Sequence, residues 1–106
     1  NAQRLARRAF HDLIDQRLDP DELEQIRNIL ASEPALVSYH RLRSRRSGHM
    51  RYVDFHIVVP NGWSVVEAHE LADHLETRIE RELAPAQVVI HVDPYDSVKA
   101  AAGPVA

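Results

Sequence analysis

This chain of 106 residues is long enough for one small domain, and its content of 44% hydrophobic and 27% charged residues is typical of a globular protein rather than a disordered segment. It has no cysteine, which excludes disulfide frameworks and thiolate metal sites, and no apolar run approaches the roughly 20 residues that span a bilayer. A formal net charge of -3 argues against a nucleic-acid partner, and with no secretory signal pattern we expect a cytoplasmic location.

The first third of the chain predicts two helices. Residues 2–17 place Leu5 and Leu13 on one apolar stripe, as in an amphipathic helix. Residues 19–22 (DPDE) combine an acidic N-cap, a proline at the first helical position and an acid at the third. They predict the start of a short helix that ends near residues 32–34.

Two extended segments follow. Residues 36–44 predict a strand, although their apolar alternation is poor, and residues 45–49 predict a hairpin turn that contains a glycine. Residues 50–59 (MRYVDFHIVV) alternate clearly. One face of this strand is apolar, whereas Asp54 and His56 share the other face.

A long helix and a third strand complete the predicted elements. Ser64 and Glu67 have the spacing of a capping box, and the apolar stripe of the helix that they start continues to about Leu83. Residues 87–93 then alternate between apolar and polar side chains, which predicts a last strand.

The predicted order ααββαβ indicates an α+β fold, in which a small sheet has helices on one face only. We expect residues 1–18 to form an N-terminal helix or linker, residues 19–96 the folded domain, and residues 97–106 a flexible tail rich in alanine, glycine and proline. The uncovered face of the sheet must then meet solvent, a ligand or a partner.

Histidine and aspartate side chains gather on this uncovered face. Positions i and i+2 of a strand point the same way, so Asp54 and His56 share the face, as do His91 and Asp93. If the two strands are neighbours, four potential ligands cluster, and imidazole nitrogen and carboxylate oxygen suit Zn²⁺ and similar ions. The alternative is a solvated sheet face without a ligand, which is the usual interpretation of a lone histidine.

Other histidines lie outside these strand pairs. His69 falls at the flank of the apolar stripe of the long helix, from which it can reach the rim of the sheet, and Asp73 is placed to fix its tautomer. His40 is also a candidate ligand, but the poor alternation around it leaves its face open. We expect no binding role for His49, in a turn, or for His74, on the solvent side of its helix.

Other classes of function find less support. Arginines at positions 41, 43, 45 and 46 suggest a nucleic-acid site, but an arginine-rich edge is more often solvated or ion-paired, and no base-stacking aromatic pattern accompanies it. The chain has no GxSxG or HExxH motif and no glycine-rich phosphate loop, and a small sheet without long loops offers little pocket for a substrate. We therefore expect no enzymatic activity.

Five stretches of the chain match a known family. They are residues 21–30 (DELEQIRNIL), 39–48 (YHRLRSRRSG), 51–59 (RYVDFHIVV), 64–76 (SVVEAHELADHLE) and 88–94 (VVIHVDP). In these stretches the sequence resembles the cytoplasmic C-terminal domain of cation diffusion facilitators, the proton-coupled exporters of Zn²⁺ and related ions. The segment EAHELAD followed by IHVDP is the more specific part of the resemblance.

The resemblance implies a ferredoxin-like, metallochaperone-like αββαβ fold, a homodimer with ligands from both protomers, and a membrane transport domain N-terminal to this chain, unless the chain is a stand-alone relative. The residues implied to bind metal are His40, His56, His69, His91 and Asp93, with Asp54 in some members. We expect a domain that senses or buffers Zn²⁺, or Cd²⁺, Co²⁺, Ni²⁺ or Mn²⁺. When it is part of a full-length transporter, it lies at the cytoplasmic face of the membrane and regulates cation efflux. The alternative is a protein-interaction module of the same fold that binds no metal.

Overall fold

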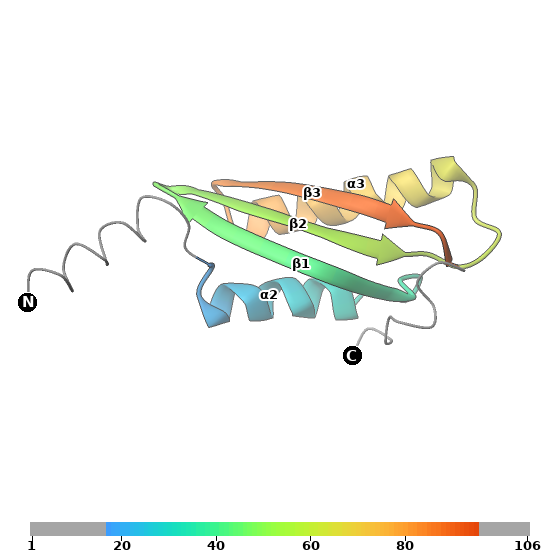
Figure 1. Ribbon diagram of the computed structural model, residues 1–106, viewed down its shortest axis with the longest axis horizontal. Coiled ribbons are helices and arrows are strands. Elements are labelled where there is room, and N and C mark those ends of the chain that lie inside the picture. The colour runs from blue at the N-terminus through green and yellow to red at the C-terminus, as the bar shows by residue number, and fades with distance from the viewer. Residues whose placement is uncertain (1–16, 96–106) are drawn as a thin grey trace, which may run out of the picture.

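The computed structural model describes residues 17–95, which Figure 1 shows as ribbons. The predicted N-terminal helix, apart from Arg17, and the predicted tail at 97–106 lie outside the described residues. The elements in chain order are α2 (Pro20–Ala31), β1 (Ser38–Ser47), β2 (Met50–Val58), α3 (Val65–Glu82) and β3 (Ala86–Asp93). Neither described helix is long and apolar enough to cross a membrane.

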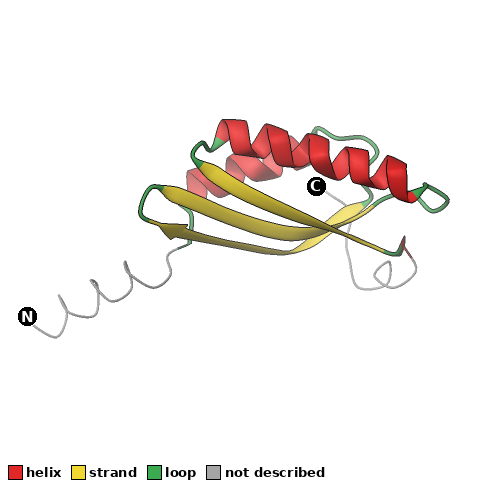
Figure 2. Ribbon diagram, turned by 90° about the horizontal axis from the view of Figure 1, so that it is seen from above, coloured by secondary structure: helices red, strands yellow, loops and turns green. Residues whose placement is uncertain are grey.

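The three strands form one sheet in the order β1-β2-β3, in which β1 and β2 run antiparallel and β2 and β3 run parallel. Both helices lie on the same side of the sheet (Figure 2). The core between the two layers contains the largest fully buried side chains, which include Phe55, Ile57, Ile26, Leu30 and Leu75. The predicted α+β class and the αββαβ order are confirmed, and within residues 17–95 one face of the sheet has no helix on it.

Side-chain caps explain where the helices begin. At α2, the Glu22 carboxylate accepts the backbone N–H of Asp19 at 3.1 Å, and a proline occupies the first turn. At α3, the Ser64 hydroxyl accepts the N–H of Glu67 and the Glu67 carboxylate accepts the N–H of Ser64, each at 3.0 Å. These bonds satisfy backbone donors that have no partner within the helix.

The hairpin between β1 and β2 is tighter than the sequence predicts. The sequence predicts a strand at 36–44 and a turn at 45–49, but β1 continues to Ser47, which pairs directly with Met50. Gly48 adopts a φ of 60°, and a two-residue hairpin loop needs a positive φ at this position. The arginines expected in the turn therefore lie in the strand.

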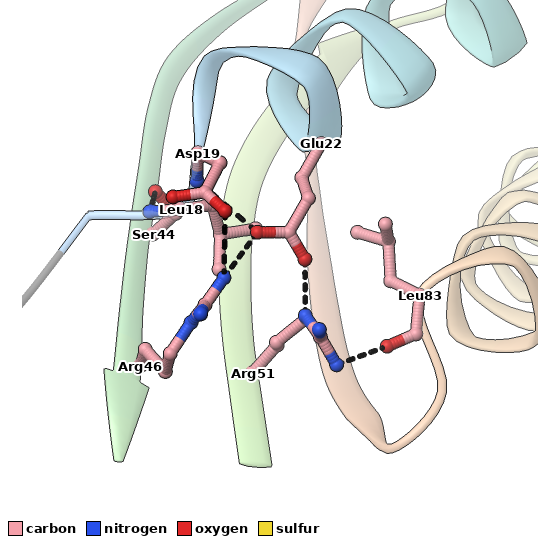
Figure 3. A network of polar contacts seen from close by, with 7 residues as sticks. All are labelled: Leu18, Asp19, Glu22, Ser44, Arg46, Arg51 and Leu83. Carbon is pink, nitrogen blue, oxygen red and sulfur yellow. Dashed lines mark hydrogen bonds and ion pairs between the residues drawn. The ribbon is translucent and has the colours of Figure 1, made fainter. Parts of the chain in front are cut away.

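An ion-pair network ties this hairpin to the helices (Figure 3). The Glu22 carboxylate contacts the guanidinium groups of Arg46 in β1 and Arg51 in β2, and Arg51 also donates to the backbone carbonyl of Leu83 at 3.1 Å. Burial raises the pKa of Glu22, but the N–H of Asp19, the hydrogen bond from Arg51 and the charges of both arginines lower it further. The net pKa lies below the usual value, so Glu22 is ionised at neutral pH.

Two carboxylates of α3 cover the outer edge of β3. Glu80 accepts the backbone N–H of Val88, and Glu76 accepts that of Ile90, each at 3.0 Å. A strand at the edge of a sheet otherwise presents unpaired N–H groups. These bonds close part of the edge and hold α3 against the strand that carries two of the predicted ligands.

Candidate metal centre

Three histidines form a row across the uncovered face of the sheet. His40 of β1 pairs with His56 of β2, and His56 pairs with His91 of β3. The rings are stacked, with centroids 5.3 Å apart between His40 and His56 and 4.6 Å apart between His56 and His91. The register of the sheet thus gathers one imidazole from each of three separate segments.

Asp93 ends β3 on the same face and reaches across β2. Its Oδ2 atom lies 2.9 Å from Nε2 of His40, and its Oδ1 atom lies 3.0 Å from Nδ1 of His56. Each of the three residues offers one ligand atom, these atoms lie within 4.8 Å of one another, and all three residues are partly buried. Within residues 17–95 this is the one group of three or more metal-ligating side chains that converges in this way.

The two histidines stabilise the charge of the Asp93 carboxylate. Burial raises the pKa of Asp93, whereas hydrogen bonds from His56 and His40, and the positive charge of either ring when it is protonated, lower it. The net pKa lies below the usual carboxyl value. Asp93 therefore carries a negative charge throughout the pH range in which imidazole titrates.

The donor set suits a divalent transition metal. Two imidazole nitrogens and a carboxylate oxygen are the ligand types of zinc sites that keep an open position. Nδ1 of His40 is buried and has no hydrogen-bond partner among the described residues. The Nε2 atom of the same ring is the one that lies beside Asp93.

Two other predicted ligands on the uncovered face lie outside this group. His91 is exposed and stacks on His56, but it is not part of the converging set. Asp54 shares the face, as the alternation predicts, but its Oδ1 atom lies 3.1 Å from Nε of Arg43. A cation of the chain itself therefore occupies the position where Asp54 was expected to meet a metal.

His69 lies on α3, away from the converging group. Nε2 of His69 is 3.3 Å from Oδ2 of Asp73, the pairing that the helical spacing predicts, and the His69 side chain is 73% exposed. His69 and Asp93 nevertheless line one cavity of about 550 Å³ at the end of the sheet. A single chain thus brings His69 near the site without adding it to the ligand group.

The structure explains why the sequence did not reveal the face of His40. The pairing of β1 with β2 shifts by one residue between His40 and Arg43, and Arg41 in this interval adopts a φ of 55°. Such a bulge interrupts the alternation from which faces are inferred. The irregular apolar pattern at 37–44 was the signal of this bulge.

Comparison with known proteins gives the family of this domain. The family model described as "Cation efflux protein, cytoplasmic domain" matches residues 18–95. The chain belongs to this family. The resemblance to cation diffusion facilitators is thereby confirmed, and it places the chain with parts of transporters rather than with enzymes.

Curated relatives of the chain are cation-efflux pumps. FieF of Yersinia pestis (strain Pestoides F) is 36% identical over 98 residues, which are 92% of this chain and 33% of that protein. FieF of Pectobacterium carotovorum subsp. carotovorum is 33% identical over 98 residues, with the same two shares of 92% and 33%. The chain thus spans about a third of the length of these relatives.

Solved structures with the same fold include metal forms. CzrB in its Zn form is 35% identical, with a TM-score of 0.70 over 78% of this chain and 96% of that chain. The metal-bound C-terminal domain of the CzcD transporter from Thermotoga maritima is 31% identical, with a TM-score of 0.66 over 70% of this chain and 87% of that chain.

Proposed function

We propose that this chain is a dimeric cytoplasmic domain that binds a divalent metal ion and regulates cation efflux when it is part of a transporter. The observation that carries the proposal is the convergence of His40, His56 and Asp93 on the sheet face that no helix covers (Figure 2). The metal forms of similar domains support it. Zn²⁺ is the expected ion, and the same donor set accepts Cd²⁺, Co²⁺, Ni²⁺ or Mn²⁺.

Within one protomer, His40, His56 and Asp93 form the centre of the proposed site. His91 joins them when its exposed ring turns away from the stack on His56. Asp54 joins only when Arg43 releases it. The Arg43 side chain is 75% exposed, and exposed ion pairs of this kind contribute little stability, so the release costs little.

His69 is proposed to act on the site of the partner protomer. It lines the same cavity as Asp93 but lies outside the converging group of its own chain. A two-fold dimer uses the same patch on both subunits. Packing of two copies at this cavity would therefore exchange His69 reciprocally and complete both sites.

The opening of such a dimer would depend on charge. Each protomer presents the Asp54 and Asp93 carboxylates on its uncovered face and has a formal net charge of -3, so two copies repel each other. A shared divalent cation cancels part of this charge and draws the protomers together. The stabilisation grows as RT ln(1 + [L]/Kd), which is about 2.7 kcal/mol at a hundredfold excess of free metal over Kd.

Calorimetric titration with Zn²⁺ tests the binding site. His56→Ala and Asp93→Ala should each weaken the affinity by about tenfold or more, because each removes a ligand atom. His74→Ala is the matched control, since His74 is an exposed histidine of α3 outside the site. Unchanged titrations of both site variants would refute the assignment, and no binding by the unaltered chain would favour the metal-free interaction module.

Mixed dimers test where His69 acts. A dimer of one His69→Ala protomer and one Asp93→Ala protomer has one doubly altered site and one intact site if His69 crosses to the partner. It should then bind about half as much Zn²⁺ as the unaltered dimer, at full affinity. If His69 serves its own protomer, each site carries one change and no site keeps full affinity.

Small-angle scattering and thermal melting, with and without Zn²⁺, test the proposed change in the dimer. The dimer should become more compact and melt at a higher temperature with metal. A monomer under both conditions, or a dimer whose size and melting temperature do not change with Zn²⁺, would contradict the bridging of two protomers by metal. This holds even if calorimetry shows that metal binds.

A further inference from the structure

The strand that presents His40 contains a bulge with an unusual backbone. His40 pairs with His56 and Arg43 pairs with Asp54, so two residues of β1, Arg41 and the residue after it, stand opposite a single residue of β2. Arg41 adopts a φ of 55° and is the one non-glycine residue within 17–95 that has a positive φ. This left-handed region favours glycine, because a Cβ atom is crowded there.

The two halves of β1 present residues of opposite parity to the core. After the bulge, Leu42 packs against the core and Arg43 lies on the uncovered face. Before it, Tyr39 packs edge-on against Phe55 in the core, and His40 lies on the uncovered face beside His56. Even-numbered residues after the bulge, such as Leu42, thus face the core, whereas even-numbered residues before it, such as His40, lie on the uncovered face.

A regular strand would turn His40 the other way. Side chains alternate with a period of two, so counting back from Leu42 without the extra residue places position 40 toward the core and Tyr39 outside. The imidazole of His40 would then enter an apolar layer, where an unpaired polar group is costly. The Asp93 carboxylate would lose one of its two histidine partners.

We propose that Arg41 is a positioning residue of the metal site, because its left-handed backbone turns His40 onto the face where it meets His56 and Asp93. This inference rests on the proposed function, since it assigns Arg41 to the same site. The side chain of Arg41 is exposed and is not among the ligand atoms, so the effect comes from its backbone rather than from its charge.

A series of variants at position 41 separates backbone from charge. Gly, Asn, Ala and Val all remove the same positive charge, but they tolerate a positive φ in that decreasing order. The Zn²⁺ affinity should stay near that of the unaltered chain in Arg41→Gly, Arg41→Asn and Arg41→Ala, since arginine tolerates this φ no better than alanine, and fall by about tenfold or more in β-branched Arg41→Val. An equal loss in all four variants would assign the effect to charge and overturn the proposal.

A second substitution shows whether Arg41 acts through His40. In a His40→Ala background, Arg41→Val should cause no further loss of Zn²⁺ affinity, since the ligand that it misplaces is already absent. Independent effects would instead add. Additive losses would therefore overturn the proposal.

Nuclear Overhauser contacts between the rings of His40 and His56 give a readout without metal. They should be present in the unaltered chain and in Arg41→Gly and lost in Arg41→Val, because the stacked rings lie 5.3 Å apart between centroids. If circular dichroism shows Arg41→Val unfolded, the other β-branched variant Arg41→Thr takes its place against Arg41→Gly. Ring contacts that persist in the folded variant would overturn the proposal. Failure of the unaltered chain to bind Zn²⁺ would overturn only the proposed function, and the ring contacts would still decide the position of His40.

Discussion

The pH dependence of the Zn²⁺ affinity should show how many imidazoles bind the metal ion. A free imidazole, with a pKa near 6.5, is about nine-tenths neutral at about pH 7.5 and about one-tenth neutral at about pH 5.5. Only the neutral ring binds metal, so each imidazole ligand lowers the affinity about tenfold across this range. A site with two imidazole ligands therefore predicts a fall of about a hundredfold over this range, and a site with three a fall of about a thousandfold.

The Asp93 carboxylate should not contribute to this fall. Burial raises its pKa, but the hydrogen bonds and charges of His56 and His40 lower it below the usual carboxyl value. It therefore stays ionised throughout the range between about pH 7.5 and about pH 5.5. The steep part of the affinity profile thus belongs to the histidines, and a separate loss from Asp93 would begin only at lower pH.

Competition of the protein with a chromophoric chelator, at steps of pH between about 7.5 and 5.5, measures this profile. His40→Ala should bind more weakly at the upper limit, and its fall across the range should be about tenfold smaller than that of the unaltered chain. His74→Ala should keep the original slope. The reasoning fails if His40→Ala retains the full slope, or if the unaltered chain loses less than about tenfold.

Three further predictions concern the scaffold. Glu22→Gln should lower the free energy of unfolding by about 2–3 kcal/mol in urea denaturation at neutral pH, because the partly buried Arg46 and Arg51 lose their anionic partner. Since the folded pKa of Glu22 lies below its unfolded value, this contribution is present above about pH 4.3 and is lost as the pH falls through the folded pKa, so the difference between variant and unaltered chain should shrink as the pH falls below the unfolded value. Glu80→Leu should cost about 1–2 kcal/mol in thermal melts and promote self-association, detected by sedimentation, because it uncovers part of the β3 edge. Ser64→Ala should cost about 1 kcal/mol in thermal melts by removing the cap of α3, and a stability equal to that of the unaltered chain would refute the role of the capping box.

Most of the fold follows from local sequence signals. The capping pairs at the starts of α2 and α3 predict both helices, because each satisfies backbone donors within a few residues of itself. The alternation of residues 50–59 predicts β2 and its two faces in the same way. The length of β1 is the exception. The sequence predicts a turn at 45–49, whereas Arg46 lies in the strand and forms an ion pair with Glu22 of α2, a contact with no local signal in the sequence.

The site was less accessible to sequence reasoning, since it depends on contacts between distant segments. Parity alone places His56 and His91 on one face of their strands, but only the parallel pairing of β2 with β3 sets them side by side. The face of His40 depends on the bulge at Arg41. The ion pair that holds Asp54 comes from another strand and has no signature in its neighbourhood of the sequence.

Glu22 and Asp93 contact residues near opposite ends of β2, Glu22 at Arg51 and Asp93 at His56. The first carboxylate stabilises the fold, whereas the second belongs to the proposed metal site. Glu22 is held by Arg46 and Arg51, and guanidinium groups are cations at any physiological pH. The ion pairs at the hairpin end of the sheet therefore persist as long as Glu22 is ionised. Asp93 is held instead by His40 and His56, whose rings can bind a metal ion only in their neutral form. A divalent ion bound by these nitrogen and oxygen atoms would supply to Asp93 the positive charge that the two arginines supply to Glu22. We therefore expect metal-dependent movement at the Asp93 end of the sheet, with the hairpin end as its fixed support.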